Sequence, residues 1–261
     1  MTEFAIKALR CNAVEPFELI VAEAVHDHFD PESLSSGHGT MSVKQSGGLW
    51  NYDPLLKIDK YLNFNPKIGG IKESNAAIDV ATGEFIVLAG TDVIVPPGWD
   101  AELLRVFAEA PDCGAAALSA FEPNATIGPR EPLDLVVEGM FSPFMMIRNH
   151  QGWRWDEAYQ RIYQDSDLIL RMRAKGLHPY RSCRAHVWHL GSVTNKGAGP
   201  EHAAECARAL AHDERLFYRR WGKSPTATFA MMRGGAQIYG HEHDAYTAKI
   251  NLHYDPMKEE G

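Results

Sequence analysis

The chain has 261 residues, of which 45% are hydrophobic and 23% charged, and its 34 acidic and 26 basic side chains give a formal net charge of −8. This composition is typical of a globular protein with a buried core and excludes an intrinsically disordered chain. The acidic balance disfavours broad, non-specific nucleic-acid binding, which needs a basic surface, but it leaves room for a local basic patch.

The sequence carries no signal for export or membrane insertion. The N-terminal segment has no apolar signal region, and no apolar run approaches the ~20 residues that a membrane helix needs. The four cysteines form no C-x-x-C pair, so reduced thiols are expected rather than disulfides or a zinc site; they are Cys11, Cys113, Cys183 and Cys206. We therefore expect a cytoplasmic protein, either bacterial or viral within a host cell.

The first elements predicted are two short strands, over Phe4–Leu9 and Phe17–Ala22. Only the residues from Arg10 to Pro16 separate them, which is too short for the usual crossover helix between parallel strands. From Asp30 to Gly70 the chain is rich in Ser, Gly, Asn, Asp and Pro, which predicts a long irregular loop.

Regular elements return after Ile71. A helix is predicted from Glu73 to Ala81, with Gly83 as its C-terminal cap. The apolar run Glu84–Ala89 then favours a central parallel strand that is buried on both faces. A helix with one apolar face follows over Asp100–Ala110.

Strands and helices continue to alternate toward the C-terminus. We predict strands at Cys113–Ala120, Phe144–Ile147 and Arg184–His189, and helices at Asp165–Lys175, stopped by Gly176, and Glu201–Trp221. This alternation predicts a layered α/β fold. We expect a single domain over residues 1–225 and an extension, residues 226–261, that packs on it.

Four polar residues occupy positions where chemistry is expected. Asp92 follows a buried strand at the sheet edge where α/β proteins bind ligands, although it could also be a turn or capping residue. Asp165 and Asp167 begin a helix, where one can cap it while the other faces a site; the alternative is capping alone. His189 ends a strand and could bind a metal ion, or be an ordinary surface or core histidine.

In order along the chain, these segments resemble the family 2 inverting glycosyltransferases with the GT-A fold. That family reads A-R-N-x-G, A-x-G-E before a hydrophobic strand, D-x-D, G-G-F-D-E, E-D-x-D with a downstream Arg and Gly, and a strand ending in His. The matching segments here are Ser74-Asn75-Ala76-Ala77, Ala81-Thr82-Gly83-Glu84, Asp92, Trp155-Asp156-Glu157, Gln164-Asp165-Ser166-Asp167 with Arg171 and Gly176, and His189. The resemblance covers roughly Gly69 to Trp221.

The resemblance implies a GT-A-like (Rossmann-like) mixed, mostly parallel sheet flanked by helices. It also implies transfer of a sugar from a nucleotide-diphosphate donor to an acceptor hydroxyl, with inversion at the anomeric carbon. Mn²⁺ or Mg²⁺ would neutralise the diphosphate and stabilise the leaving group. By similarity, Asp92 and His189 hold the metal, and Asp165 is the general base that accepts the hydroxyl proton.

The resemblance also assigns residues to the donor side of the site. Lys72 and Asn75 fall in the family's donor-side segment. Glu23 falls at the position of the Asp that follows the family's second strand and contacts the nucleotide base. Because the two N-terminal strands are so close in sequence, we expect a shortened nucleotide-binding part.

On the acceptor side, Trp153 is the better candidate for stacking on a sugar, and Trp155 is favoured for core packing. Asp156 and Glu157 could contact acceptor or sugar hydroxyls, or could be turn residues. Asp167 is expected to support its helix, together with Arg171, and could also hydrogen-bond the acceptor.

Two departures from the family motifs stand out. Gly90 takes the place of the first Asp of D-x-D, which predicts weaker metal affinity, and Gln164 replaces the Glu of E-D-x-D. A second candidate function is therefore a non-catalytic nucleotide-sugar or glycan-binding protein on a decayed transferase scaffold. A third, a nucleotidyltransferase that makes sugar nucleotides, is disfavoured because the chain has no G-x-G-T-R-x-x-P run.

The acceptor is left open as a glycan, a lipid-linked sugar, a protein or a hydroxylated base in DNA. A basic stretch at the end of the last long helix, Arg215, Arg219, Arg220 and Lys223, could touch a phosphate-bearing acceptor, or could be a solvated helix end. The histidine-rich runs His26–His28 and His241–His243 are interpreted as exposed loop residues.

Overall fold

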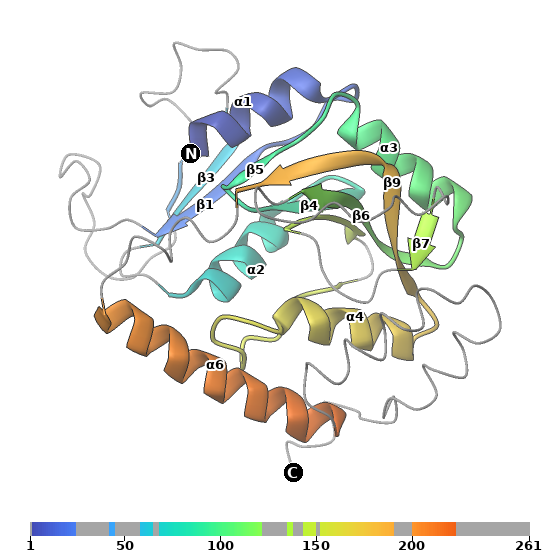
Figure 1. Cartoon of the computed structure of the whole chain (residues 1–261). Helices are drawn as coiled ribbons and strands as arrows, with labels where there is room; N and C mark the ends of the chain where they lie inside the picture. The colour runs from blue at the N-terminus through green and yellow to red at the C-terminus, as the bar shows by residue number, and fades with distance from the viewer. Residues whose placement is uncertain are drawn as a thin grey trace.

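In the computed structural model, the described residues are 2–24, 42–44, 58–64, 68–121, 135–137, 143–149, 152–190 and 200–222. They form two β-sheets and five α-helices (Figure 1). The C-terminal extension, the two histidine-rich runs and Lys223 lie outside the described residues. Within the described part of the chain, no helix is long and apolar enough to cross a membrane.

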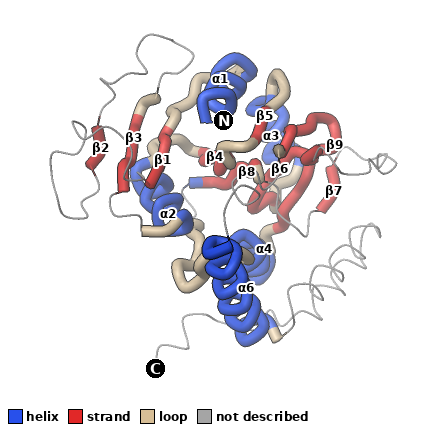
Figure 2. Tube along the Cα trace, turned by 60° about the vertical axis from the view of Figure 1, so that its left-hand side comes forward, coloured by secondary structure: helices blue, strands red, loops and turns tan. Residues whose placement is uncertain are grey.

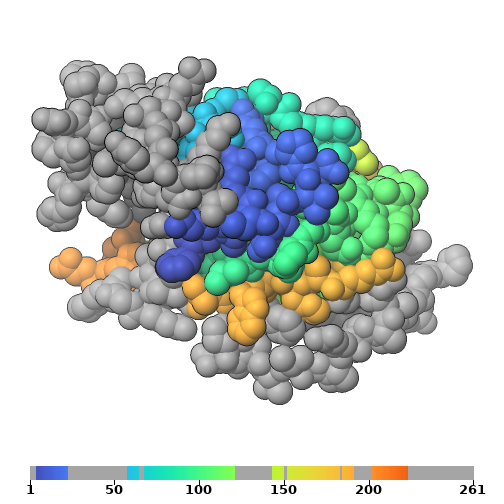
Figure 3. All heavy atoms as spheres, turned by 90° about the horizontal axis from the view of Figure 1, so that it is seen from above, coloured from blue at the N-terminus to red at the C-terminus, as the bar shows by residue number. Residues whose placement is uncertain are grey.

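The N-terminal segment is a helix, α1 (Thr2–Asn12), so the strand predicted at Phe4–Leu9 is wrong. Ala5, Ile6 and Leu9 are buried and lie on one face of this helix. Six mostly apolar residues fit a strand and a buried helix segment equally well, which is why the pattern misled. Seen from above, α1 (blue) forms much of the surface beside the residues of α3 (Figure 3).

The smaller sheet has the order β1-β3-β2 and contains β1 (Ile20–Ala24), β2 (Ser42–Lys44) and β3 (Lys60–Phe64). β1 and β3 are parallel, and β2 is antiparallel to β3. Because α1 is helical, β1 is the first strand of the chain, and residues 25–59 connect it to its parallel neighbour β3. The expectation of a shortened N-terminal part stays a prediction, but its argument from Phe4–Leu9 as the first strand no longer holds.

The larger sheet has the order β4-β8-β6-β9-β5, and β7 also pairs with β9. Its strands are β4 (Phe85–Ala89), β5 (Val93–Ile94), β6 (Cys113–Phe121), β7 (Leu135–Val137), β8 (Phe144–Arg148) and β9 (His178–His189). The mixed sheet is confirmed, but the mostly parallel arrangement is not. Among the described pairings only β1·β3 and β6·β9 are parallel, because β8 runs antiparallel between β4 and β6.

β4 ends the order of the larger sheet, and its described partner is the antiparallel β8, so it is not a central parallel strand. Its apolar sequence has another cause. Phe85 and Val87 pack against one hydrophobic cluster, while Ile86 and Leu88 belong to or pack against the other. Both faces of β4 are therefore covered, and coverage rather than the direction of neighbouring strands produces a continuous apolar run.

The remaining helices lie close to where the sequence predicts them. They are α2 (Gly70–Val80), α3 (Trp99–Glu109), α4 (Gln164–Ala174) and α6 (Pro200–Trp221). Gly176 adopts φ of 76° just after α4, as expected of a residue that ends a helix. The C-cap of α2 is Ala81, so Gly83 is not the cap.

The larger sheet separates two helical layers, as Figure 2 shows. Residues that alternate along β6 and β8 contribute to opposite clusters, as the two-residue period of a strand requires. Ala116, Phe144 and Met146 pack with α1 and α3. Ala115, Ala117, Met145 and Ile147 pack with α2, α4 and α6.

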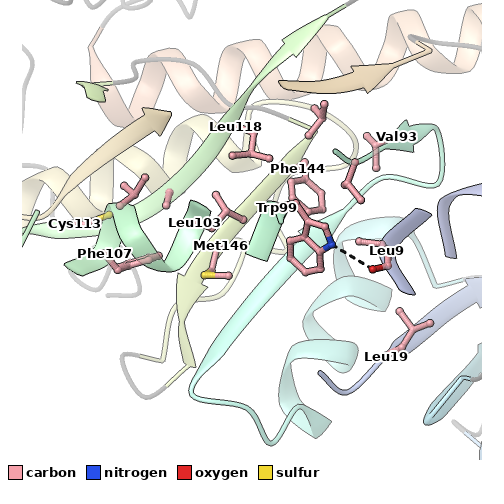
Figure 4. Packing of buried hydrophobic residues seen from close by; sticks show 14 of the residues in the cluster. Leu9, Leu19, Val93, Trp99, Leu103, Phe107, Cys113, Leu118, Phe144 and Met146 are labelled. Atoms are coloured by element: carbon pink, nitrogen blue, oxygen red, sulfur yellow. Dashed lines mark hydrogen bonds between the residues drawn. The ribbon is translucent and has the colours of Figure 1, made fainter. Parts of the chain in front are cut away.

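Trp99, at the start of α3, lies at the centre of the first cluster (Figure 4). Its indole N–H donates to the carbonyl oxygen of Leu9 over 3.3 Å, and its ring meets Phe17 and Phe144 edge-on at centroid distances of 5.7 and 5.3 Å. This one side chain thus joins α1, the segment before β1, α3 and β8.

Truncating Leu103 in this cluster should be costly. Leu103 is 0% exposed, so Leu103→Ala removes buried methyl groups and leaves a cavity. We expect a loss of about 2–5 kcal/mol in the free energy of unfolding, measured by urea denaturation. Leu210→Ala, at a leucine that is 43% exposed on α6, is the matched control and should change stability by less than about 0.5 kcal/mol. Equal effects of the two substitutions would contradict the position of the core.

Candidate functional site

A pocket of about 1040 Å³ lies between β1, α2, β4 and the start of α4. Its wall includes Ala22, Ser74, Leu88, Thr91, Trp155 and Asp165, and its deeper part reaches Trp99 and Met146. Gly90 and Thr91, which follow β4 directly, are part of this wall. The pocket therefore runs along β4 and includes its carboxyl end, where open α/β sheets bind their ligands.

Asp92 and His189 are brought together by the pairing of β5 with β9. Val93 is the register partner of His189, and the backbone N–H of Leu190 donates to the carbonyl oxygen of Asp92 over 2.9 Å. As a result, His189 Nε2 lies 3.3 Å from Asp92 Oδ2. Asp92 itself lies in the turn between β4 and β5 and follows the pocket residues Gly90 and Thr91.

The spacing of this pair fits two neighbouring ligands of one metal ion. In an octahedral site with ligands at about 2.1 Å, adjacent ligand atoms lie about 3 Å apart, close to the distance observed here. A carboxylate oxygen and an imidazole nitrogen are both suitable donors for Mn²⁺. No group of three or more His, Cys, Asp or Glu side chains that could hold a metal occurs in the described residues, so the remaining ligands would be oxygens from outside this set.

Gly90 provides the space that the Asp92 carboxylate occupies. A Cβ atom built on Gly90 would lie 2.8 Å from Asp92 Oδ1, closer than real Cβ contacts allow. The Gly90 amide also donates to the carbonyl oxygen of Pro143 over 3.0 Å, which ties this turn to the start of β8. An Asp at position 90 would therefore push the Asp92 carboxylate away from its present position.

Asp165 lies in the first turn of α4 and forms part of the pocket wall. Its Oδ1 accepts the backbone N–H of Ser166 over 2.8 Å and the Ser166 hydroxyl over 3.4 Å. The helix N-cap is Tyr163, and no side chain caps it, so capping by Asp165 or Asp167 is not observed. Burial raises the pKa of Asp165, and the bonds from Ser166 only partly oppose this. A carboxylate with a raised pKa in a pocket is a candidate acid–base group.

Asp167 has a different environment from Asp165, although both begin the same helix. It is 1% exposed and accepts hydrogen bonds from the Tyr159 hydroxyl at 3.3 Å, Trp221 Nε1 at 3.1 Å and Arg171 Nε at 2.7 Å. Arg220 Nη1 lies 3.6 Å from the same carboxylate. These contacts give Asp167 a supporting role and leave it closed to an acceptor in this structure.

Of the three residues placed on the donor side, Lys72 and Asn75 lie one helical turn apart on α2, and Glu23 lies on a different element, β1. Asn75 on α2 is 6% exposed. Its side-chain oxygen accepts the backbone N–H of Trp155 over 3.0 Å, and its side-chain nitrogen donates to the carbonyl oxygen of Trp155 over 2.9 Å and to the Glu157 carboxylate. Lys72 is exposed on the same helix. Glu23 lies on β1 in register with Asn63 of β3. Asn75 therefore orients the segment that carries Trp155.

The acceptor-side candidates are divided between the pocket and structural contacts. Trp153 and Trp155 are both half-buried against the second cluster, but Trp155 is the one that lines the pocket. The preference for Trp153 as the residue that stacks on a sugar stays a prediction. Asp156 accepts the Ala158 amide at 2.8 Å and pairs with Arg220 at 2.5 Å, which matches the turn-residue alternative. Glu157 is exposed.

Among the buried acids that sequence reasoning did not single out is one on α6. Asp213 on α6 accepts three backbone amides from the segment that precedes Asp165. Its signal in the sequence is its place on the apolar face of a helix, among Ala209, Leu216 and Phe217. An acidic residue on such a face must have buried partners.

No protein-family model and no curated protein sequence matches this chain. Solved structures do. A fragment of S. aureus TarS, residues 1–349, in complex with UDP-GlcNAc superposes with a TM-score of 0.54 at 12% identity, covering 95% of this chain and 75% of that one. The same fragment with UDP gives a TM-score of 0.51 at 12% identity, with 92% and 72% covered.

The chain shares their fold. A longer TarS structure gives a TM-score of 0.53 at 14% identity, where 87% of this chain spans 42% of the TarS chain. At least 87% of the chain is included in each of these superpositions.

Proposed function

We propose that this chain is a metal-dependent, inverting glycosyltransferase with the GT-A fold. It would move a sugar from a nucleotide-diphosphate donor to an acceptor hydroxyl. The observation that carries the proposal is that Asp165 lines the pocket while Asp92, which pairs with His189, directly follows the pocket residues Gly90 and Thr91. The shared fold supports it, since TarS structures contain UDP and UDP-GlcNAc, a nucleotide and a nucleotide sugar.

The donor would occupy the pocket with its diphosphate toward Asp92 and His189. These two side chains would hold a divalent cation, Mn²⁺ or Mg²⁺, and oxygens of the diphosphate and water would complete its coordination. When bound, the cation supplies positive charge that stabilises the leaving diphosphate. The pocket volume, about 1040 Å³, is sufficient for a nucleotide sugar.

Asp165 would act as the general base. Its Oδ1 is held by Ser166, and its other oxygen, Oδ2, would accept the proton of the acceptor hydroxyl. The hydroxyl oxygen would attack the anomeric carbon opposite the diphosphate, a new C–O bond would form, and the bond to the diphosphate would break with inversion. Because burial raises the pKa of Asp165, its ionised form is a stronger base than an exposed carboxylate.

Nucleotide binding tests the proposal directly. We expect UDP or another nucleoside diphosphate to bind in the presence of Mn²⁺, and Asp92→Asn to weaken this binding by at least about tenfold, measured by isothermal titration calorimetry. In EDTA the two proteins should bind the nucleotide equally weakly. Asp79→Asn is the control and should bind like wild type. Asp79 is an exposed residue of α2 whose carboxylate pairs with Arg154.

An assay of turnover distinguishes a glycosyltransferase from a non-catalytic nucleotide-sugar-binding protein. Wild type should release the nucleoside diphosphate from one of a panel of nucleotide sugars, with or without an acceptor glycan, protein or hydroxylated DNA. Metal-dependent binding without release or transfer in any combination would favour the non-catalytic binding protein. Failure of every nucleotide to bind would contradict both.

A further inference from the structure

The segment that leads into Asp165, residues 152–163, contains no helix or strand and is held both by apolar packing against the second cluster and by polar contacts. At one end, Asn75 of α2 binds the backbone of Trp155. At the other end, the contacts come from α6. The direction in which the chain enters α4, and with it the position of Asp165, depends on these attachments.

Asp213 is the main attachment from α6. It is 0% exposed, and its Oδ1 accepts the backbone N–H of Gln160 over 2.9 Å. Its Oδ2 accepts the amides of Arg161 and Ile162 over 2.8 and 2.9 Å. Bonds from amides to a carboxylate are stronger than bonds between neutral groups. Three consecutive amides bound to one carboxylate fix the course of the backbone just before Asp165.

The backbone conformation of Tyr163, the next residue, indicates that surrounding contacts enforce the path of the chain into α4. Its φ of 65° is in the left-handed region, which a tyrosine rarely adopts and which costs roughly 1–3 kcal/mol. Such a conformation persists only where the surroundings enforce it. Its ring packs on Phe217 of α6 at a centroid distance of 5.6 Å. α6 therefore holds residues on both sides of the Ile162–Tyr163 peptide bond.

We propose that Asp213 is a positioning residue for Asp165, acting through the backbone of residues 160–163. This inference rests on the proposed function, in which Asp165 is the general base. A base displaced by about 1 Å can lose about 100-fold in rate. Asp213 is not part of the pocket wall, so it would set the rate of proton transfer and leave donor binding unchanged.

The first test compares Asp213→Asn with wild type. An asparagine offers one acceptor oxygen where the native side chain uses two, so at least one of the three amides loses its partner. We expect kcat to fall about 10–100-fold, while the KM for the donor and the Kd for the nucleoside diphosphate stay within about twofold. Glu201→Gln, at an exposed glutamate on the same helix, should match wild type. An unchanged kcat in folded Asp213→Asn would overturn the proposal, and so would equal losses of kcat and donor binding.

Phe217→Leu keeps the proposal testable if Asp213→Asn does not fold. It retains an apolar side chain at the helix but removes the ring that packs on Tyr163. We expect a kcat about 3–10-fold lower, with donor KM unchanged. A lower donor affinity with an unchanged kcat would count against α6 as the element that positions the base.

Amide hydrogen exchange distinguishes failure of this inference from failure of the proposed function, because it needs no turnover. In Asp213→Asn the amides of residues 160–162 and those of the first turn of α4, which carries Asp165, should lose protection together. The amides of β4 should keep theirs. Loss confined to residues 160–162, with the first turn of α4 unchanged, would overturn the positional link even if the protein is a transferase.

Discussion

Asp165→Asn is expected to lower kcat by about 10²–10⁴-fold, the usual contribution of a general base. The asparagine keeps the size of the side chain and can still accept the Ser166 amide, so the start of α4 should be preserved. Nucleotide binding with Mn²⁺ should match wild type, because the metal pair is Asp92 and His189. The measurement is the steady-state rate of nucleoside diphosphate release, with calorimetry on the same samples. Full activity in Asp165→Asn would exclude this carboxylate as the base.

The same variant should be more stable than wild type at neutral pH. Burial raises the pKa of Asp165 in the folded state above its value in the unfolded chain. Its contribution to stability is therefore present below the unfolded pKa and is lost as pH rises through the folded pKa. Asn carries no charge to bury, so the Tm of Asp165→Asn should exceed that of wild type near pH 7, and the gap should close toward pH 4.

Two measurements complete this prediction. In the pH dependence of kcat, the apparent pKa of the acid limb should lie above the ordinary pKa of an aspartate, because the base must be ionised and its pKa is raised. Asp79→Asn, at an exposed ion pair with Arg154, should show no comparable gain in Tm near pH 7. A Tm for Asp165→Asn below that of wild type at neutral pH would contradict the burial of this carboxylate.

The helices from Ile71 onward follow from sequence periodicity, but β5 and β7 were not predicted and β9 begins at His178, six residues before the predicted start at Arg184. α3 and α4 carry apolar residues at helical spacing, as in Leu103 and Phe107, and each helix is followed by a chain-breaking or turn segment. Strand partners do not follow from periodicity. β8 inserts antiparallel between β4 and β6, and a short apolar run contains no information about the direction of its neighbours.

The prediction for the N-terminal part was wrong for a more specific reason. Phe4–Leu9 lacks enough length to distinguish a two-residue from a 3.6-residue period, and the helix is decided by packing of Ile6 and Leu9 against α3 and the larger sheet. β2 and β3 both lie in the span interpreted as irregular, because its overall richness in Gly, Ser, Asn, Asp and Pro outweighed two short strands.

The sequence identified candidate site residues but could not predict which of them contact one another. The family resemblance singled out Asp92 and His189, yet their contact depends on the β5–β9 register, which links positions far apart in the chain. Asn75 was assigned a donor-side role, but its amide binds the Trp155 backbone, a tertiary contact that no local pattern shows. Asp213 carries a readable signal only as a charged residue on an apolar helix face.

Asp167→Asn is expected to destabilise the protein by about 3 kcal/mol or more, opposite in sign to Asp165→Asn at neutral pH. The Asp167 carboxylate is 1% exposed and pairs with Arg171, with Arg220 nearby, while Tyr159 and Trp221 donate to it. Removing its charge leaves these buried groups without their anionic partner.

Urea denaturation of the two variants side by side measures the difference, and each serves as the control for the other. The two substitutions are chemically identical and lie two residues apart on one helix, so helix propensity and loss of one negative charge affect both alike. A difference in sign can then come only from what surrounds each carboxylate, burial without a cationic partner among the contacts described above for Asp165, and cationic and N–H partners for Asp167. Equal and small effects would show that neither environment is as described, and that the D-S-D run is an ordinary solvated helix start.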